Sequence, residues 1–154
     1  MSAFAKHIEV VLQHEGGDVH DPADPGGETK YGISKRAFPQ EDIKALTKAR
    51  AIQLYLTHYW GPSKAEQIPK ALQLIHLDTA VNCGVVMAVR MLQRAAGVKD
   101  DGVLGPVTID AAQRVTTQAY ADQRLAYYER IITRNPKLSK FRRGWVRRVY
   151  SLIQ

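Results

Sequence analysis

The chain has 154 residues, a net charge of +7 and an apolar fraction of 45%. This length fits one domain of ordinary size, and the apolar fraction excludes an intrinsically disordered chain. A single cysteine excludes an internal disulfide and a zinc cluster built from cysteines. The positive charge favours an anionic partner, which leaves nucleic acid, a membrane surface and bacterial cell wall as alternatives.

The first segment predicts an amphipathic helix that ends near Glu15. Ser2 is a suitable N-cap, and the pair Gly16-Gly17 is typical of a helix end. The segment lacks the apolar run of a signal peptide, and no stretch approaches the roughly 18 apolar residues of a membrane span. The apolar residues of the predicted helix share one face: Phe4, Ile8, Val11 and Leu12.

Residues 16–40 predict a structured loop, rich in proline and glycine, with a short hairpin at residues 29–34. Loops of this length inside a compact domain are usually functional. Apolar residues with a helical period, bounded by glycine or proline, predict helices in the rest of the chain. The predicted helices cover residues 41–59, 69–82, 86–96 and 107–133, followed by a basic segment from residue 140. The expected fold class is mainly α.

Two carboxylates border this loop, as the hydrolysis of a glycosidic bond requires. Glu15, at the helix end, is the better candidate for the acid that protonates the leaving oxygen. Asp24 suits the role of base or nucleophile, although Asp18 and Asp21 lie in the same loop and could share it. The hydroxyl of Thr29 can both donate and accept hydrogen bonds, so it could position a water molecule or orient Asp24.

The spacing of Glu15, Asp24 and Thr29 is similar to that in phage lysozymes of the T-even type, with an Asp-to-Thr gap one residue shorter. Several motifs in order resemble glycoside hydrolase family 108, which groups N-acetylmuramidases and includes phage endolysins. These motifs are Glu15-Gly16-Gly17, Asp24-Pro25-Gly26-Gly27-Glu28-Thr29, Tyr31-Gly32-Ile33, Tyr59-Trp60 and Asp78-Thr79-Ala80-Val81-Asn82-Cys83-Gly84.

The resemblance implies a lysozyme-like helical fold and cleavage of the bond from N-acetylmuramic acid to N-acetylglucosamine, with Glu15 as catalytic residue. Within the motifs, we expect Tyr31, Tyr59, Asp78 and Asn82 to bind the glycan substrate. Asp78 and Asn82 share a helix face. For Asn82, a place in the floor of the cleft and a helix cap before a glycine are both open. We expect no metal and no cofactor, because the five histidines do not fall at metal spacing.

The second half carries a pattern that resembles the core of peptidoglycan-binding modules. A Leu92-Gln93 pair precedes the segment Asp101-Gly102-Val103-Leu104-Gly105-Pro106-Val107-Thr108. We therefore expect a catalytic region at residues 1–88 and a peptidoglycan-binding region at residues 89–154, packed into the same globule. Whether the second region binds wall by itself or completes the fold is open.

The C-terminal segment concentrates positive charge and could contact the anionic wall or the outer-membrane surface. The alternative is the solvated face of a terminal helix. The residues are Arg134, Lys137, Lys140, Arg142, Arg143, Arg147 and Arg148.

The function that fits best is a monomeric muramidase, a phage or prophage endolysin made without a signal peptide in the host cytoplasm and acting on periplasmic peptidoglycan. A bacterial protein exported by another route would have the same sequence features, so phage or bacterial origin is open. An inactive peptidoglycan-binding or export-accessory protein is the alternative. We expect no nucleic-acid partner, because the chain has no helix-turn-helix or RNA-binding signature.

Overall fold

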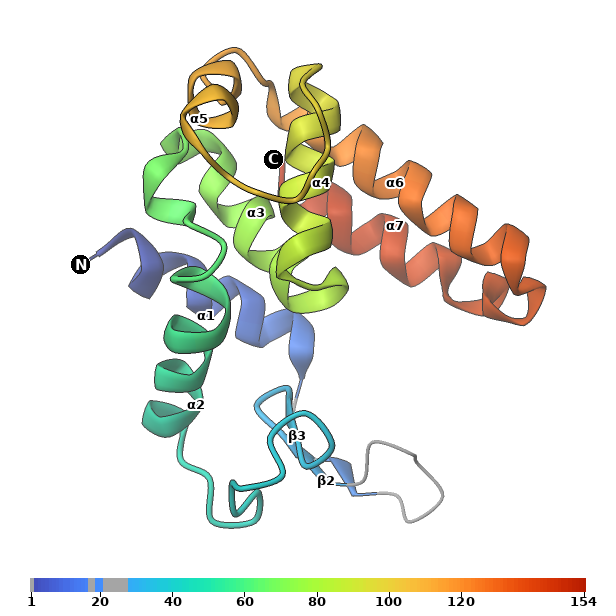
Figure 1. The fold of residues 1–154 in the computed structure, drawn as a ribbon. Coiled ribbons are helices and arrows are strands. Elements are labelled where there is room, and N and C mark those ends of the chain that lie inside the picture. Colours follow the sequence, from blue (N-terminus) through green and yellow to red (C-terminus); the bar gives the residue numbers. More distant parts are fainter. Residues whose placement is uncertain (1, 17–18, 21–27) are drawn as a thin grey trace. The chain divides into compact units, whose positions relative to one another are not determined.

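The computed structural model describes residues 2–16, 19–20 and 28–154. It divides into two compact units, Met1–His58 and Tyr59–Gln154, which are described in turn. Helices make up most of the described chain (Figure 1), so the prediction of a mainly α fold is confirmed. Among the described residues, no helix combines the length and the apolar character that a membrane span needs.

The first unit begins with α1, Ala3–Glu15, whose two ends are set by local contacts. The Ser2 hydroxyl accepts a hydrogen bond from the Ala5 N–H at 3.1 Å. At the other end, Gly16 adopts a φ of +79° and its N–H donates to the Leu12 carbonyl. Both predicted ends are confirmed, and the predicted apolar face is buried: Phe4, Ile8, Val11 and Leu12.

A three-stranded antiparallel sheet follows, in the order β1 (Val19–His20), β2 (Glu28–Lys30) and β3 (Ile33–Ser34). The predicted hairpin is its β2–β3 pair, with Lys30 opposite Ile33. Two residues connect these strands, Tyr31 at φ 54° and Gly32 at φ 77°. Positive φ at both positions is the requirement of the tight turn that best matches the twist of a hairpin.

The helix predicted at residues 41–59 begins later, as α2, Lys48–Tyr55, followed by a π-helical segment, η1 (Leu56–Trp60). The Thr47 hydroxyl caps α2 by accepting the Arg50 N–H at 3.1 Å. Ile43 and Leu46 are buried, but they belong to the turn and the extended residues that precede the helix.

The second unit is built from helices that pack on one another, and Figure 1 shows α6 and α7 side by side. The predicted single helix at residues 107–133 is wrong, because it is divided into α5 and α6. The Thr116 hydroxyl caps α6 by accepting the Ala119 N–H at 3.0 Å. The elements are η2 (Ala65–Gln67), α3 (Lys70–Cys83), α4 (Val85–Ala96), α5 (Pro106–Ala112), α6 (Thr117–Arg134), η3 (Pro136–Phe141) and α7 (Arg142–Ser151).

Candidate active site

Glu15, the predicted acid, is the last residue of α1 and lies against the β2–β3 turn in the first unit. A Cβ atom at Gly32 would lie 2.7 Å from the Glu15 Cβ and 2.9 Å from its Cγ, and closer still to the Tyr55 hydroxyl. Only a glycine therefore lets the turn approach the stem of Glu15 this closely. The half-buried glutamate is held between its own helix and the hairpin.

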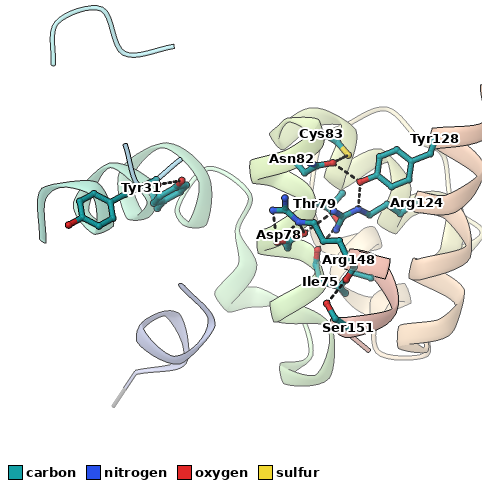
Figure 2. A network of polar contacts seen from close by, with 11 residues as sticks. Tyr31, Ile75, Asp78, Thr79, Asn82, Cys83, Arg124, Tyr128, Arg148 and Ser151 are labelled. Atoms are coloured by element: carbon teal, nitrogen blue, oxygen red, sulfur yellow. Dashed lines mark hydrogen bonds and ion pairs between the residues drawn. The ribbon is translucent and has the colours of Figure 1, made fainter. Parts of the chain in front are cut away.

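The same turn is fixed from the other side by α2. The buried Tyr55 donates its hydroxyl proton to the Tyr31 carbonyl oxygen at 2.7 Å (Figure 2). Tyr31 itself is half-buried, and so is Thr29, which lies in β2 between Val19 and Ser34. Three elements of the first unit thus meet at the predicted acid: the end of α1, the hairpin and α2.

The predicted base or nucleophile, Asp24, lies outside the described residues, as do Asp18 and Asp21. Their assignment stays a prediction. Tyr59 lies in η1, where it is half-buried, and it belongs to the second unit together with the remaining predicted site residues.

Asp78 on α3 is fully buried, and two guanidinium groups hold its carboxylate. Arg148 of α7 donates to both oxygens, at 2.8 Å from Nη2 and 3.0 Å from Nε. Arg124 of α6 adds an ion pair at 2.8 Å, also fully buried. Burial alone would raise the pKa of Asp78, but the two arginines outweigh it and hold the pKa below its ordinary value. The observed role of Asp78 is to join three helices, and its predicted substrate contact stays a prediction.

A directed chain of hydrogen bonds leads from this ion pair to Asn82 (Figure 2). Arg124 has only donors, so its Nε donates to the Tyr128 hydroxyl at 2.9 Å, and that hydroxyl donates to the Asn82 Oδ1 at 2.5 Å. The Cys83 thiol donates to the same oxygen at 3.3 Å. Asn82 is exposed, and its amide nitrogen donates to no acceptor among the described residues. The amide is thus oriented with its oxygen toward Tyr128.

The helix cap is formed without Asn82. Gly84, at φ +97°, ends α3 and donates its N–H to the Ala80 carbonyl. Cys83 is half-buried, and burial raises the pKa of its thiol, so it is kept protonated and is a poor nucleophile.

Gln93 on α4 organises the segment that resembles peptidoglycan-binding modules. Its amide nitrogen lies 2.9 Å from the Asp101 Oδ1, 3.0 Å from the Val103 carbonyl and 3.1 Å from the Thr108 hydroxyl. Its amide oxygen accepts the Gly102 N–H at 2.9 Å. These residues border a pocket of about 330 Å³. One buried side chain therefore ties the turn at residues 101–103 to the start of α5.

Sequence reasoning missed Arg124 and Tyr128, the two side chains that orient Asn82. Tyr120, Arg124 and Tyr128 follow one another at intervals of four along α6, and all three are buried. An arginine at an apolar position of a helix face was the available signal, because buried arginines require a partner. Among the described residues, no group of three or more His, Cys, Asp or Glu side chains is placed to hold a metal ion.

The basic C-terminal residues divide into paired and exposed ones. Arg142 donates to Glu129 at 2.8 Å, and Arg148 is the partner of Asp78. Trp145 is half-buried and stacks on Tyr128 with 4.7 Å between ring centroids. The tryptophan thus covers the hydrogen-bond chain that ends at Asn82.

Comparisons with known proteins agree with the two sequence patterns. Residues 8–84 match the family model described as Glycosyl hydrolase 108, and residues 87–150 match the one described as Predicted Peptidoglycan domain. A solved structure, titled "Structure of Brucella abortus SagA", is similar over 97% of this chain and 91% of that chain, with 33% identity and a TM-score of 0.82. No curated protein matches the chain.

Proposed function

This chain belongs to the glycosyl hydrolase 108 family, and we propose that it is an N-acetylmuramidase with Glu15 as general acid. The family and the accompanying peptidoglycan domain make peptidoglycan the substrate of the hydrolase. The bond that we propose is the one from N-acetylmuramic acid to N-acetylglucosamine. The observation that carries the assignment of Glu15 is the close packing of its stem against the Gly32 turn.

In the proposed reaction Glu15 protonates the glycosidic oxygen as the bond breaks. A second carboxylate, Asp24, then acts as base toward water or as nucleophile, and Thr29 positions that partner. The packing around Glu15 supports its role, because an acid works best when it is held in its productive geometry before substrate arrives. Tyr55 contributes indirectly, by anchoring the Tyr31 carbonyl of the turn.

We propose that Asn82 donates a hydrogen bond to the glycan. The chain from Arg124 through Tyr128 occupies the Asn82 oxygen, which leaves the amide hydrogens to donate to a carbonyl or hydroxyl oxygen of the glycan. Tyr31 and Tyr59 are proposed to contact sugar rings with their aromatic faces.

The decisive experiment is mass spectrometry of the soluble fragments released from purified Gram-negative peptidoglycan. The wild type should release fragments with reducing N-acetylmuramic acid ends, and Glu15→Gln should release none. Glu9→Gln is the matched control on the same helix, since its exposed ion pair with Lys48 contributes little to stability. Anhydro ends would identify a lytic transglycosylase, and the absence of fragments from the wild type would favour the inactive wall-binding protein.

The biological role that we propose is host lysis by a phage or prophage endolysin, which is made in the cytoplasm and reaches the wall when the membrane is opened. Expression in a Gram-negative host should leave the cells intact until chloroform permeabilises the inner membrane, and turbidity should then fall. Glu15→Gln should abolish this fall. Lysis that occurs without permeabilisation would contradict the proposed route.

A further inference from the structure

Four arginines surround one pocket of about 210 Å³ in the second unit. Arg90 and Arg94 come from α4 at a spacing of four residues, and Arg130 and Arg134 come from α6 at the same spacing. Among the described residues, the carboxylate that pairs with these arginines is that of Asp100, which contacts Arg90 and Arg94. Four guanidinium groups and one carboxylate leave a net charge of three positive units around a small volume.

Asp100 holds the two arginines of α4 in place but satisfies only part of their charge. Its Oδ2 lies 2.7 Å from the Arg94 Nε and 3.8 Å from the Arg90 Nη2. The hydrogen bond from Arg94 lowers the pKa of Asp100, so the carboxylate is ionised at neutral pH. The Nε of Arg90 is buried and has no acceptor within the described chain. Arg130 and Arg134 form no ion pair with a described residue.

Stability alone does not account for this arrangement. Arg94 and Arg134 lie in the last turns of their helices, where a cation complements the helix dipole. Arg90 and Arg130 lie one turn earlier, and like charges four residues apart on a helix repel each other. An anion in the pocket would remove this repulsion between the four groups.

The rest of the lining is apolar or aromatic and comes from the same two helices: Met87, Tyr127 and Ile131. These side chains can contact methyl groups beside an anionic head group. Guanidinium groups bind carboxylates through two parallel hydrogen bonds, and several of them can bind several carboxylates at once.

We propose that this pocket binds the carboxylate-bearing stem peptide of peptidoglycan. The peptide carries free carboxylates and alanine methyl groups, which match the charged and apolar parts of the lining. The pocket lies wholly within the segment that matches the predicted peptidoglycan domain. The inference rests on peptidoglycan as the substrate of the proposed function, and it assigns the peptide to α4 and α6 of the second unit.

Calorimetric titration of a soluble, sugar-free stem tetrapeptide into the full chain tests the proposal. The protein carries Glu15→Gln in every sample, so the result is independent of glycosidase turnover. Arg130→Gln with Arg134→Gln should weaken binding about tenfold or more, because each substitution removes a charged hydrogen-bond donor. The matched control is Arg143→Gln with Arg147→Gln, two exposed cations of α7 with the same change in net charge, and it should change affinity less than about twofold.

Two further titrations separate the possible ligands. A tetrapeptide whose carboxylates are amidated should lose binding, and inorganic phosphate should compete only weakly. Equal losses in both double variants, unchanged binding of the amidated peptide, or tighter binding of phosphate than of peptide would each overturn the proposal. Tetrapeptide binding by the Glu15→Gln protein, together with a wild type that releases no glycan fragments, would refute the muramidase and leave the pocket assignment intact.

Discussion

Gly32→Ala is the substitution that tests whether the hairpin turn positions the acid. The change adds one methyl group at a residue whose φ is +77° and whose nearest side-chain neighbours include Glu15. It leaves every proposed catalytic group chemically intact. Any loss of activity in the folded protein must therefore come from displacement of Glu15, of the turn, or of Tyr55, whose hydroxyl lies nearest to the added Cβ.

The size of the effect follows from two contributions. An L-residue in the left-handed region costs about 1–2 kcal/mol relative to glycine. The new Cβ would lie 2.7 Å from the Glu15 Cβ, whereas real contacts of this kind begin at 3.0–3.4 Å, so the two groups must separate by 0.3–0.7 Å. Misplacement of a catalytic group by about 1 Å can reduce the rate about 10²-fold. We expect a fall in kcat of about tenfold or more.

The assay is the initial rate of fragment release from purified peptidoglycan, measured together with the free energy of unfolding in urea. Gly97→Ala is the control, because Gly97 also has a positive φ of +71° but no atom within 4 Å of the added Cβ. The control should lose stability while kcat is unchanged. Equal rates for the two alanine variants would refute the argument that Gly32 positions Glu15.

Three further predictions concern the second unit. Asp78→Asn should destabilise the fold by about 3–5 kcal/mol in urea unfolding, because it leaves the buried Arg124 and the partly exposed Arg148 without their charged partner. Burial lowers the pKa of His76 to about 4, so below about pH 6.5 the unfolded state binds a proton that the folded state does not. The free energy of unfolding should therefore fall by about 3 kcal/mol between pH 6.5 and 4. His76→Gln should flatten this slope. Gln93→Leu should cost about 2–4 kcal/mol and increase hydrogen exchange at residue 102, since it removes several buried hydrogen bonds.

The parts of the fold that could be predicted depend on neighbours in the chain. Both ends of α1 follow from a serine and a glycine within one turn of the helix, and the hairpin turn follows from a glycine between two short strands. The stop of α4 at Gly97 has the same local origin, a φ of +71°. For the same reason the Glu-Gly-Gly motif was enough to place Glu15 at a helix end.

The helix errors arose where two local signals compete. Thr47 and Thr116 each cap a helix, yet each also lies inside a longer run of apolar residues with helical spacing. Ile43 and Leu46 are three residues apart, as on a helix face, but turns place them in the core. Over fewer than two helical turns, the spacing of buried residues does not distinguish a helix from successive turns. Residues 41–47 and 113–116 were therefore wrongly assigned to helices.

The side-chain contacts within the second unit could not be predicted from the sequence, because the residues that pair are far apart in the chain. The Asp78–Arg148 contact joins residues separated by 70 positions, and the Tyr128–Asn82 contact joins residues separated by 46. Helical spacing places Asp78 and Asn82 on one face and therefore suggests one role for both. The packing of α6 and α7 on α3 separates these roles, since it buries one residue and leaves the other exposed.

The direction of the hydrogen bonds explains why that separation matters for function. An arginine can only donate, so the buried pair at Asp78 forces the Tyr128 hydroxyl to accept from one side and donate to the other. The Asn82 amide then has one orientation, with its donors available to a ligand. A core of apolar residues would support the same helices but would leave the amide free to turn over. The cluster of Asp78, Arg124 and Arg148 therefore stabilises the fold and also fixes the Asn82 amide with its N–H groups toward a ligand. None of these three charged residues needs to touch the substrate for this effect.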